Sequence, residues 1–361
     1  MDRRELLLSM FDASGFGLEV GPSYSPLLPK RRGYNVETVD HANAEELREK
    51  YRNDVSVDIS NIEEVDYISD GGSLVDLIGQ TERYDYIFAS HVIEHVTDVV
   101  RFLSDCERLL KPDGVLVLAV PDKRFCFDVL RPVSTIGSAI QAYLENHRRH
   151  PPGMVFDHVS LVSRKGANVV WLEPNLDGLD FFHSVSEAKA ALDDACNRQD
   201  YIDIHRWQFT PEYFRYFVHV LAETGFIGLR EARFHKNDAI HLHLHEFYIT
   251  LSRAGNGPDK SMLDLLKAAH RELREIAVTG HGSAQVPRDA GRTDVETILD
   301  ALREAQWQLK VERASVASRE DELATLRNEL AIAQAHRDAV LNSSSWRITA
   351  PLRRLKDVIS R

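Results

Sequence analysis

The chain has 361 residues, more than one compact domain usually needs, so there is room for an appended segment. A formal net charge of -12 argues against a broad basic face, and nucleic acid is therefore not an expected partner. Three cysteines without a CxxC pattern, and no apolar run of the roughly 18 residues that a membrane span needs, favour a cytoplasmic protein.

Five short apolar or β-branched runs predict buried strands. In chain order they cover residues 16–20, 34–39, 55–59, 84–89 and 115–120. Helices are expected between them, at Ala44–Tyr51 and at Val92–Leu110, where apolar residues recur at helical spacing. This alternation predicts an α/β fold with a doubly wound, mainly parallel sheet.

Polar residues or glycine close each predicted strand. They are Gly21, Asp40, Asp58, Ser90 and the pair Pro121 and Asp122. In open parallel sheets the ligand lies beyond the carboxyl ends of the strands, at the point where the strand order reverses. We therefore expect the chemistry of the protein at this edge of the sheet.

Five segments in this order and spacing resemble class I S-adenosylmethionine-dependent methyltransferases, which have a Rossmann-like fold. They read GLEVGPSYSP, VETVD, VSVD, YDYIFASHVIEHV and LLKPDGVLVLAVPD, within about residues 16–125. The resemblance implies a cofactor, S-adenosylmethionine, and a site made of Glu19, Gly21, Asp40, Asp58, Ile59 and Ser90. In it, Glu19 and Gly21 form the first motif, Asp40 binds the ribose hydroxyls, and Asp58 with Ile59 lies beside the adenine.

The loop after the first predicted strand departs from the pattern of many relatives. Where they have E-x-G-x-G-x-G, this chain has one glycine, Gly21, followed by Pro22. A subset of the family resembles this proline-containing version. A glycine at this position lets the backbone approach a ligand closely, and a carboxylate can accept hydrogen bonds from two hydroxyls.

The segment His91-Val-Ile-Glu94-His95 also matches H-x-x-E-H, a zinc-peptidase signature. A peptidase would need this motif well inside a long helix and a third ligand downstream. Here the motif directly follows an apolar strand, which fits the methyltransferase resemblance better. In that family the first residues after this strand face the methyl donor and acceptor. We expect no metal at this motif.

Methyl transfer is an in-line displacement, so the enzyme must hold the acceptor on the axis of the sulfur–methyl bond. A base helps if the acceptor is a hydroxyl, and histidine titrates near neutrality. His91, His95 and His205 are therefore the catalytic candidates, with His158 behind them. The sequence does not single out one of them.

Two further groups of polar residues leave alternatives open. His241, His243 and His245 alternate and would share one face of a strand, where they could bind a metal but more often pack or face solvent. Residues 123–204 are expected to form the acceptor or lid region. There Lys123, Arg124, Asp128 and Arg131 would suit a phosphorylated or polyhydroxylated acceptor, or solvent.

The composition changes after Arg253, which ends the predicted methyltransferase domain at 1–253. A helix and linker are expected over 254–292, a coiled coil over 293–341 and a basic amphipathic tail over 342–361. The coiled-coil seam repeats every seven residues, at Val295, Leu302, Leu309, Val316, Leu323 and Leu330. It predicts self-association or docking to a partner enzyme, with a single charged helix as the alternative.

The terminal SSSWRITAPLRRLKDVISR resembles a tail of bacterial glycosyltransferases and methyltransferases that act on cell-surface polysaccharides. Its aromatic and basic residues could contact the inner membrane face peripherally. Together these features suggest methylation of a sugar hydroxyl in glycan or lipid-linked glycan assembly. The alternatives are a methyltransferase of another small molecule or protein, and a catalytically inactive scaffold.

Overall fold

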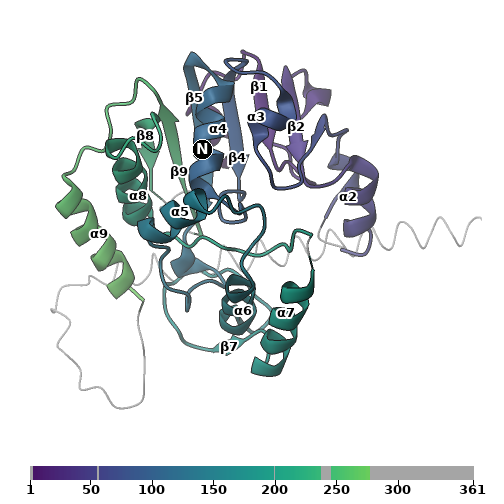
Figure 1. Cartoon of the computed structure of the whole chain (residues 1–361), viewed down its shortest axis with the longest axis vertical. Coiled ribbons are helices and arrows are strands. Elements are labelled where there is room, and N and C mark those ends of the chain that lie inside the picture. Colours follow the sequence, from purple (N-terminus) through teal and green to yellow (C-terminus); the bar gives the residue numbers. More distant parts are fainter. Residues whose placement is uncertain (1–2, 55–56, 199, 237–244, 277–361) are drawn as a thin grey trace, which may run out of the picture. The chain divides into compact units, whose positions relative to one another are not determined.

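The computed structural model describes residues 3–54, 57–198, 200–236 and 245–276 of the chain. Its main feature is a seven-stranded sheet in the order β3-β2-β1-β4-β5-β9-β8 (Figure 1). The strands are β1 Gly17–Val20, β2 Val36–Asp40, β3 Tyr67–Ile68, β4 Tyr84–Ser90, β5 Leu110–Pro121, β8 Arg230–His235 and β9 Glu246–Ser252. The first five run parallel, whereas β9 pairs antiparallel with both β5 and β8. The predicted doubly wound, mainly parallel sheet is confirmed.

Helices and loops cover both faces of this sheet. The helices are α1 Arg3–Leu8, α2 Ala44–Tyr51, α3 Leu74–Ile78, α4 Val99–Leu109, α5 Ile136–Leu144, α6 Pro152–Leu161, α7 Val185–Asn197, α8 Pro211–Glu223 and α9 Met262–Arg274. Side chains of α3, α4 and α8 pack with one set of strand residues, such as Ile87 and Ala89. The alternate residues, Tyr86 and Phe88, pack with α1 and the loop after β1. Strand alternation thus gives the sheet two apolar faces.

The third strand was predicted in the wrong place. Residues 55–56 lie outside the described part, and Asp58 is the N-cap of a short 3₁₀ helix, Ile59–Asn61, where its carboxylate accepts the backbone N–H of Ser60. The third strand is β3, two residues long, and it pairs with β2 alone at the edge of the sheet. A strand so short carries little apolar pattern, which explains the error.

The helix predicted from Val92 begins at Val99 instead. Asp98 caps it by accepting the backbone N–H of Arg101 at 2.9 Å. Before Asp98 the chain forms only a single turn, in which the N–H of His95 donates to the carbonyl of Val92, and the carbonyl of Glu94 accepts the N–H groups of Arg206 and Trp207 instead of continuing a helix. His91 and His95 consequently do not share a helix face.

The stretch between β5 and α8 contains a helical insert, whereas its first helix, α5, packs with α4 and α8 in the main core. Helices α6 and α7 pack against each other and lie apart from α8 and α9 (Figure 1). Beside them, β6 Ser163–Lys165 pairs with β7 Leu179–Phe181 in a small antiparallel sheet. This insert coincides with the predicted acceptor region.

The C-terminal predictions are not tested by the described residues. The chain divides into two units, 1–283 and 284–361, and the coiled coil and tail fall in the second, outside the described residues. The helix expected within 254–292 is present as α9. No helix in the described ranges is both long and apolar enough to cross a membrane.

Candidate functional site

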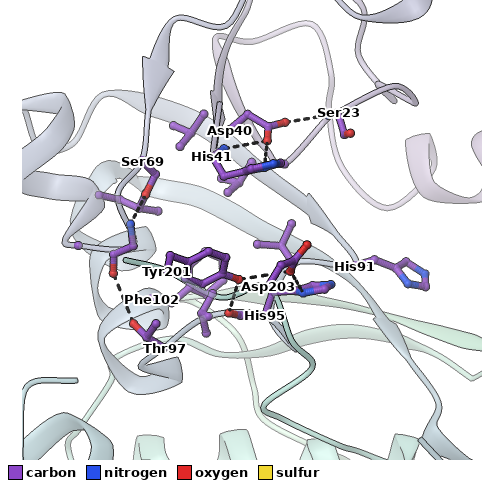
Figure 2. Close-up of a pocket in the computed structure, with 18 of the residues that line it drawn as sticks. Ser23, Asp40, His41, Ser69, His91, His95, Thr97, Phe102, Tyr201 and Asp203 are labelled. Atoms are coloured by element: carbon purple, nitrogen blue, oxygen red, sulfur yellow. Dashed lines mark hydrogen bonds and ion pairs between the residues drawn. The ribbon is translucent and has the colours of Figure 1, made fainter. Parts of the chain in front are cut away.

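A pocket with a cavity volume of about 250 Å³ opens at the carboxyl ends of the parallel strands. The segments that follow β1, β2, β3 and β4 line it, and residues of the segment after α7 complete it (Figure 2). This is the position that the strand order predicts for a ligand, because the chain reverses direction across the sheet between β1 and β4.

The loop after β1 approaches the pocket through Gly21. This residue has φ of +67°, and a Cβ built on it would lie 2.6 Å from Cγ2 of Val92. Both conditions exclude a side chain at this position without rearrangement. Gly21 and Val92 line the pocket, so the glycine is required where β1 and β4 end side by side.

Glu19 is buried at 2% exposure and does not line the pocket. Its carboxylate accepts the backbone N–H groups of Leu27 and Leu28 at 2.6 and 3.0 Å. Burial raises the pKa of this carboxyl to about 7, against the effect of the two hydrogen bonds. The structure therefore places Glu19 as the anchor of the loop that carries Gly21.

Asp40 ends β2 with its carboxylate at the pocket wall (Figure 2). It accepts the backbone N–H of Ser23 at 2.9 Å and that of His41 at 2.8 Å. These bonds fix the carboxylate while leaving it further acceptor capacity. Beside it, Val39 and Leu74 provide an apolar wall, so the set suits the hydroxyls and the flat base of a nucleoside.

Three other predicted cofactor residues lie away from the cavity wall. Asp58 and Ile59 belong to the 3₁₀ helix described above, and Ser90 accepts a hydrogen bond from Arg3 at 2.7 Å. In their place, Ser69 and Gly71 follow β3 and line the pocket. The signal for them was the turn sequence SDGGS, which becomes meaningful once β3 is located.

His91 stands at the end of β4 with φ of +52°, and its side chain is one third exposed. Its Nε2 lies 3.0 Å from Oε2 of Glu246, which Arg3 and Tyr248 also contact. Burial alone would lower the pKa of His91, but the bond to Glu246 and the nearby charge of Glu94 raise it.

His95 faces the pocket beside Tyr201 and Asp203 (Figure 2). Its Nδ1 lies 2.8 Å from Oδ1 of Asp203, and Tyr201 donates to its backbone carbonyl at 3.1 Å. Burial acts to lower the pKa of His95, and the carboxylates of Asp203 and Glu94 raise it. The sequence analysis missed Asp203 and Tyr201, because nothing local indicates that the segment after α7 returns to the pocket.

His205 lies behind His95, with ring centroids 4.5 Å apart and the rings edge to face. Its Nδ1 lies 2.5 Å from Oδ2 of Asp128, which Arg131 also contacts. Charge from His205 and Arg131 overcomes burial and lowers the pKa of Asp128 to about 2. Asp128 and Arg131 are buried and bonded within the protein, as are Lys123 and Arg124, so the expectation that these four face an acceptor or solvent is wrong.

The three candidate histidines meet around one carboxylate. Oε1 of Glu94 lies 3.5 Å from Nδ1 of His91, 3.9 Å from Nε2 of His95 and 4.0 Å from Nε2 of His205. Glu94 is fully buried, and neither of its oxygens has a hydrogen-bond partner among the described residues. His158 lies next to His205, and burial lowers its pKa to about 3. We call Glu94 with His91, His95 and His205 the Glu94 cluster.

The alternating histidines of the late strand are only partly described. His241 and His243 lie outside the described residues, and His245 precedes β9, with its ring 6.0 Å from that of His91.

Residues 2–180 match the family model described as "Methyltransferase domain". The curated relatives include the ubiquinone biosynthesis O-methyltransferase of Rhodopseudomonas palustris, 46% identical over 52 residues, which are 14% of this chain and 21% of that protein. The match thus spans about a fifth of that relative's length.

Among solved structures, similarity extends to the CcbJ methyltransferase from Streptomyces caelestis, at 15% identity over 70% of this chain and 94% of that one, with a TM-score of 0.37. A SAM-dependent methyltransferase from Aquifex aeolicus is 12% identical over 69% of this chain and 89% of that one, with a TM-score of 0.34. The family match identifies residues 2–180 as a methyltransferase domain, and the order of the sheet and the glycine loop at Gly21 agree with this assignment.

Proposed function

We propose that the protein transfers the methyl group of S-adenosylmethionine to a hydroxyl oxygen. The observation that carries this proposal is the Glu94 cluster, which adjoins the pocket through His91 and His95. An amine attacks as a neutral nucleophile, whereas a hydroxyl becomes a good nucleophile only when its proton is removed. A buried carboxylate among three histidines is suited to this removal.

In the proposed reaction the acceptor oxygen attacks the methyl carbon in line with the carbon–sulfur bond. The new oxygen–carbon bond forms as the carbon–sulfur bond breaks, and the sulfur keeps the electron pair, which yields S-adenosylhomocysteine. The hydroxyl proton passes to the Glu94 cluster. Gly21 and Asp40 hold the donor on one side of the pocket, and His95 with Tyr201 forms the acceptor side.

The acceptor we propose is a sugar hydroxyl, free or in a lipid-linked glycan of cell-surface polysaccharide assembly. Support comes from the resemblance of the C-terminal tail and from a relative that is named an O-methyltransferase. Self-association or a partner enzyme at residues 293–341, and a peripheral membrane contact of the tail, belong to the same proposal. They would hold the enzyme beside a lipid-linked substrate.

The test is a transfer assay with isotope-labelled S-adenosylmethionine and matched acceptors. The panel contains monosaccharides, lipid-linked sugars, a catechol and an amino sugar, and mass spectrometry locates the label. We expect the label on a sugar oxygen. Label on nitrogen would contradict the O-methyltransferase proposal, and label on the catechol with none on any sugar would contradict the acceptor class.

A further inference from the structure

Glu94, His95 and His205 have the arrangement of a metal-binding triad. One ligand atom from each of the three side chains lies within 4.8 Å of the other two. Glu94 is fully buried and both its oxygens are without a hydrogen-bond partner among the described residues. A buried carboxylate left without donors is costly, and a cation bound to it would relieve that cost.

The two histidines are oriented for metal binding by carboxylates behind them. Nδ1 of His95 contacts Asp203 at 2.8 Å, and Nδ1 of His205 contacts Asp128 at 2.5 Å. A proton on each Nδ1 leaves the Nε2 lone pair free, and both Nε2 atoms point toward Oε1 of Glu94, at 3.9 and 4.0 Å. Such carboxylate–histidine pairs commonly support metal ligands and fix their tautomer.

The distances from Glu94 to the two histidines require only a small closure. Ligands bound at about 2.1 Å in a tetrahedral site stand about 3.4 Å apart. Side-chain rotation of Glu94 can supply the difference of about half an ångström from its separations to the two Nε2 atoms. The ligand atoms of the two histidines lie within 4.8 Å of each other, and rotation of the imidazoles must bring them closer. Two imidazoles with one carboxylate favour a divalent transition metal such as zinc over magnesium, which prefers oxygen ligands.

A second group, made of His91, His245 and Glu246, also has ligand atoms within 4.8 Å. There the carboxylate of Glu246 already accepts hydrogen bonds from Arg3 at 2.6 Å and from Tyr248 at 2.7 Å. A cation would compete with the guanidinium for the same oxygens. The carboxylate of Glu246 is therefore stabilised by hydrogen bonds within the protein, whereas the carboxylate of Glu94 has none among the described residues.

We propose that Glu94, His95 and His205 bind a zinc-class divalent cation, with the fourth position open toward the pocket through His95. Binding of the ion stands on this geometry alone. Its role rests on the proposed function: a cation at this place would bind the acceptor oxygen and lower the pKa of the hydroxyl. The proton would then leave to His91 or to water.

The test is a calorimetric titration of the full chain, freed of metal with a chelator, with zinc, and with cobalt as a spectroscopic probe. The variants are Glu94→Gln, His205→Ala and Asp128→Asn, and the matched control is His183→Ala, a partly exposed histidine outside the cluster. Thermal unfolding of each variant checks that it folds.

We expect one equivalent of zinc to bind to the wild type and to His183→Ala. Glu94→Gln and His205→Ala should weaken binding at least about 100-fold, and Asp128→Asn by about 10- to 100-fold. Cobalt should give visible absorption bands that are lost in Glu94→Gln. Absence of stoichiometric binding, or binding that persists in folded Glu94→Gln, would overturn the proposal.

The failure of this proposal can be told from that of the proposed function. A chain that binds no zinc but methylates a hydroxyl would overturn the metal site and leave O-methylation intact. Zinc binding that depends on Glu94, together with methylation of nitrogen alone, would leave the metal site and overturn O-methylation.

Discussion

Replacing Gly21 by alanine should weaken cofactor binding through one identifiable contact. The backbone there has φ of +67°, which costs a residue with a side chain about 1–2 kcal/mol. In addition, the new Cβ would lie 2.6 Å from Cγ2 of Val92, about 1 Å closer than an ordinary contact. Val92 must then turn, and it lines the pocket.

Gly79 provides a matched control. It has φ of +70°, a Cβ added to it would meet nothing within 4 Å, and it does not line the cofactor pocket. Gly79→Ala should therefore carry the same backbone cost as Gly21→Ala without the clash. Urea unfolding should show a loss of about 1–2 kcal/mol in Gly79→Ala, and a loss about 1 kcal/mol larger in Gly21→Ala, which also carries the clash with Val92.

Only Gly21→Ala should lose affinity for S-adenosylmethionine. The displaced Val92 narrows the cavity, and a loss of about 1.4 kcal/mol of contact with the ligand corresponds to roughly tenfold weaker binding. Isothermal titration calorimetry measures this directly. Equal affinity of Gly21→Ala and wild type, or equal weakening in Gly79→Ala, would refute the reasoning.

Two further predictions concern buried charges, and urea unfolding checks both. Because Glu19 has a pKa of about 7 when folded and an ordinary value of 4.5, the folded state keeps a proton that the unfolded state releases. Through this group the free energy of unfolding should fall by up to about 3 kcal/mol as pH rises from 4.5 to 7. Glu19→Gln should lack this pH-dependent fall. The same pH dependence of the free energy of unfolding in Glu19→Gln and in the wild type would contradict the prediction. Arg124→Met should cost about 3–5 kcal/mol because it removes the guanidinium bonded to the fully buried carboxylate of Asp122, whereas Arg230→Met, which loses an exposed pair with Glu223, should cost under about 1 kcal/mol. Similar costs for the two arginines would show that burial does not decide the effect.

Local sequence patterns predicted four of the first five strands, and they failed where the chain depends on distant partners. β4 and β5 are apolar because both their faces are covered, so the sequence shows them clearly. The edge strand β3 has two residues and pairs on one side, so a β-branched run upstream was mistaken for it.

The residues of the site also divide into those that a local sequence pattern indicates and those that depend on distant segments. Gly21 and Asp40 end neighbouring strands, so the local pattern marked their position, and the family resemblance assigned them to the cofactor. Asp203 and Asp128 reach the histidines through the insert after β5, over sequence separations that no local motif encodes. The side chain of Ser90 likewise accepts a hydrogen bond from Arg3, 87 residues away, which no local pattern indicates.

The most direct test of the account is titration of the full chain with S-adenosylmethionine, beside Asp40→Ala and the control Asp76→Ala. Asp76 is an exposed carboxylate on α3 that does not line the cofactor pocket. Asp40→Ala should bind at least about thirtyfold more weakly, equal to about 2 kcal/mol, the size of one charge-assisted hydrogen bond, while Asp76→Ala binds as the wild type does. Undiminished binding by folded Asp40→Ala, or no binding by the wild type, would contradict the assignment of this pocket to the methyl donor.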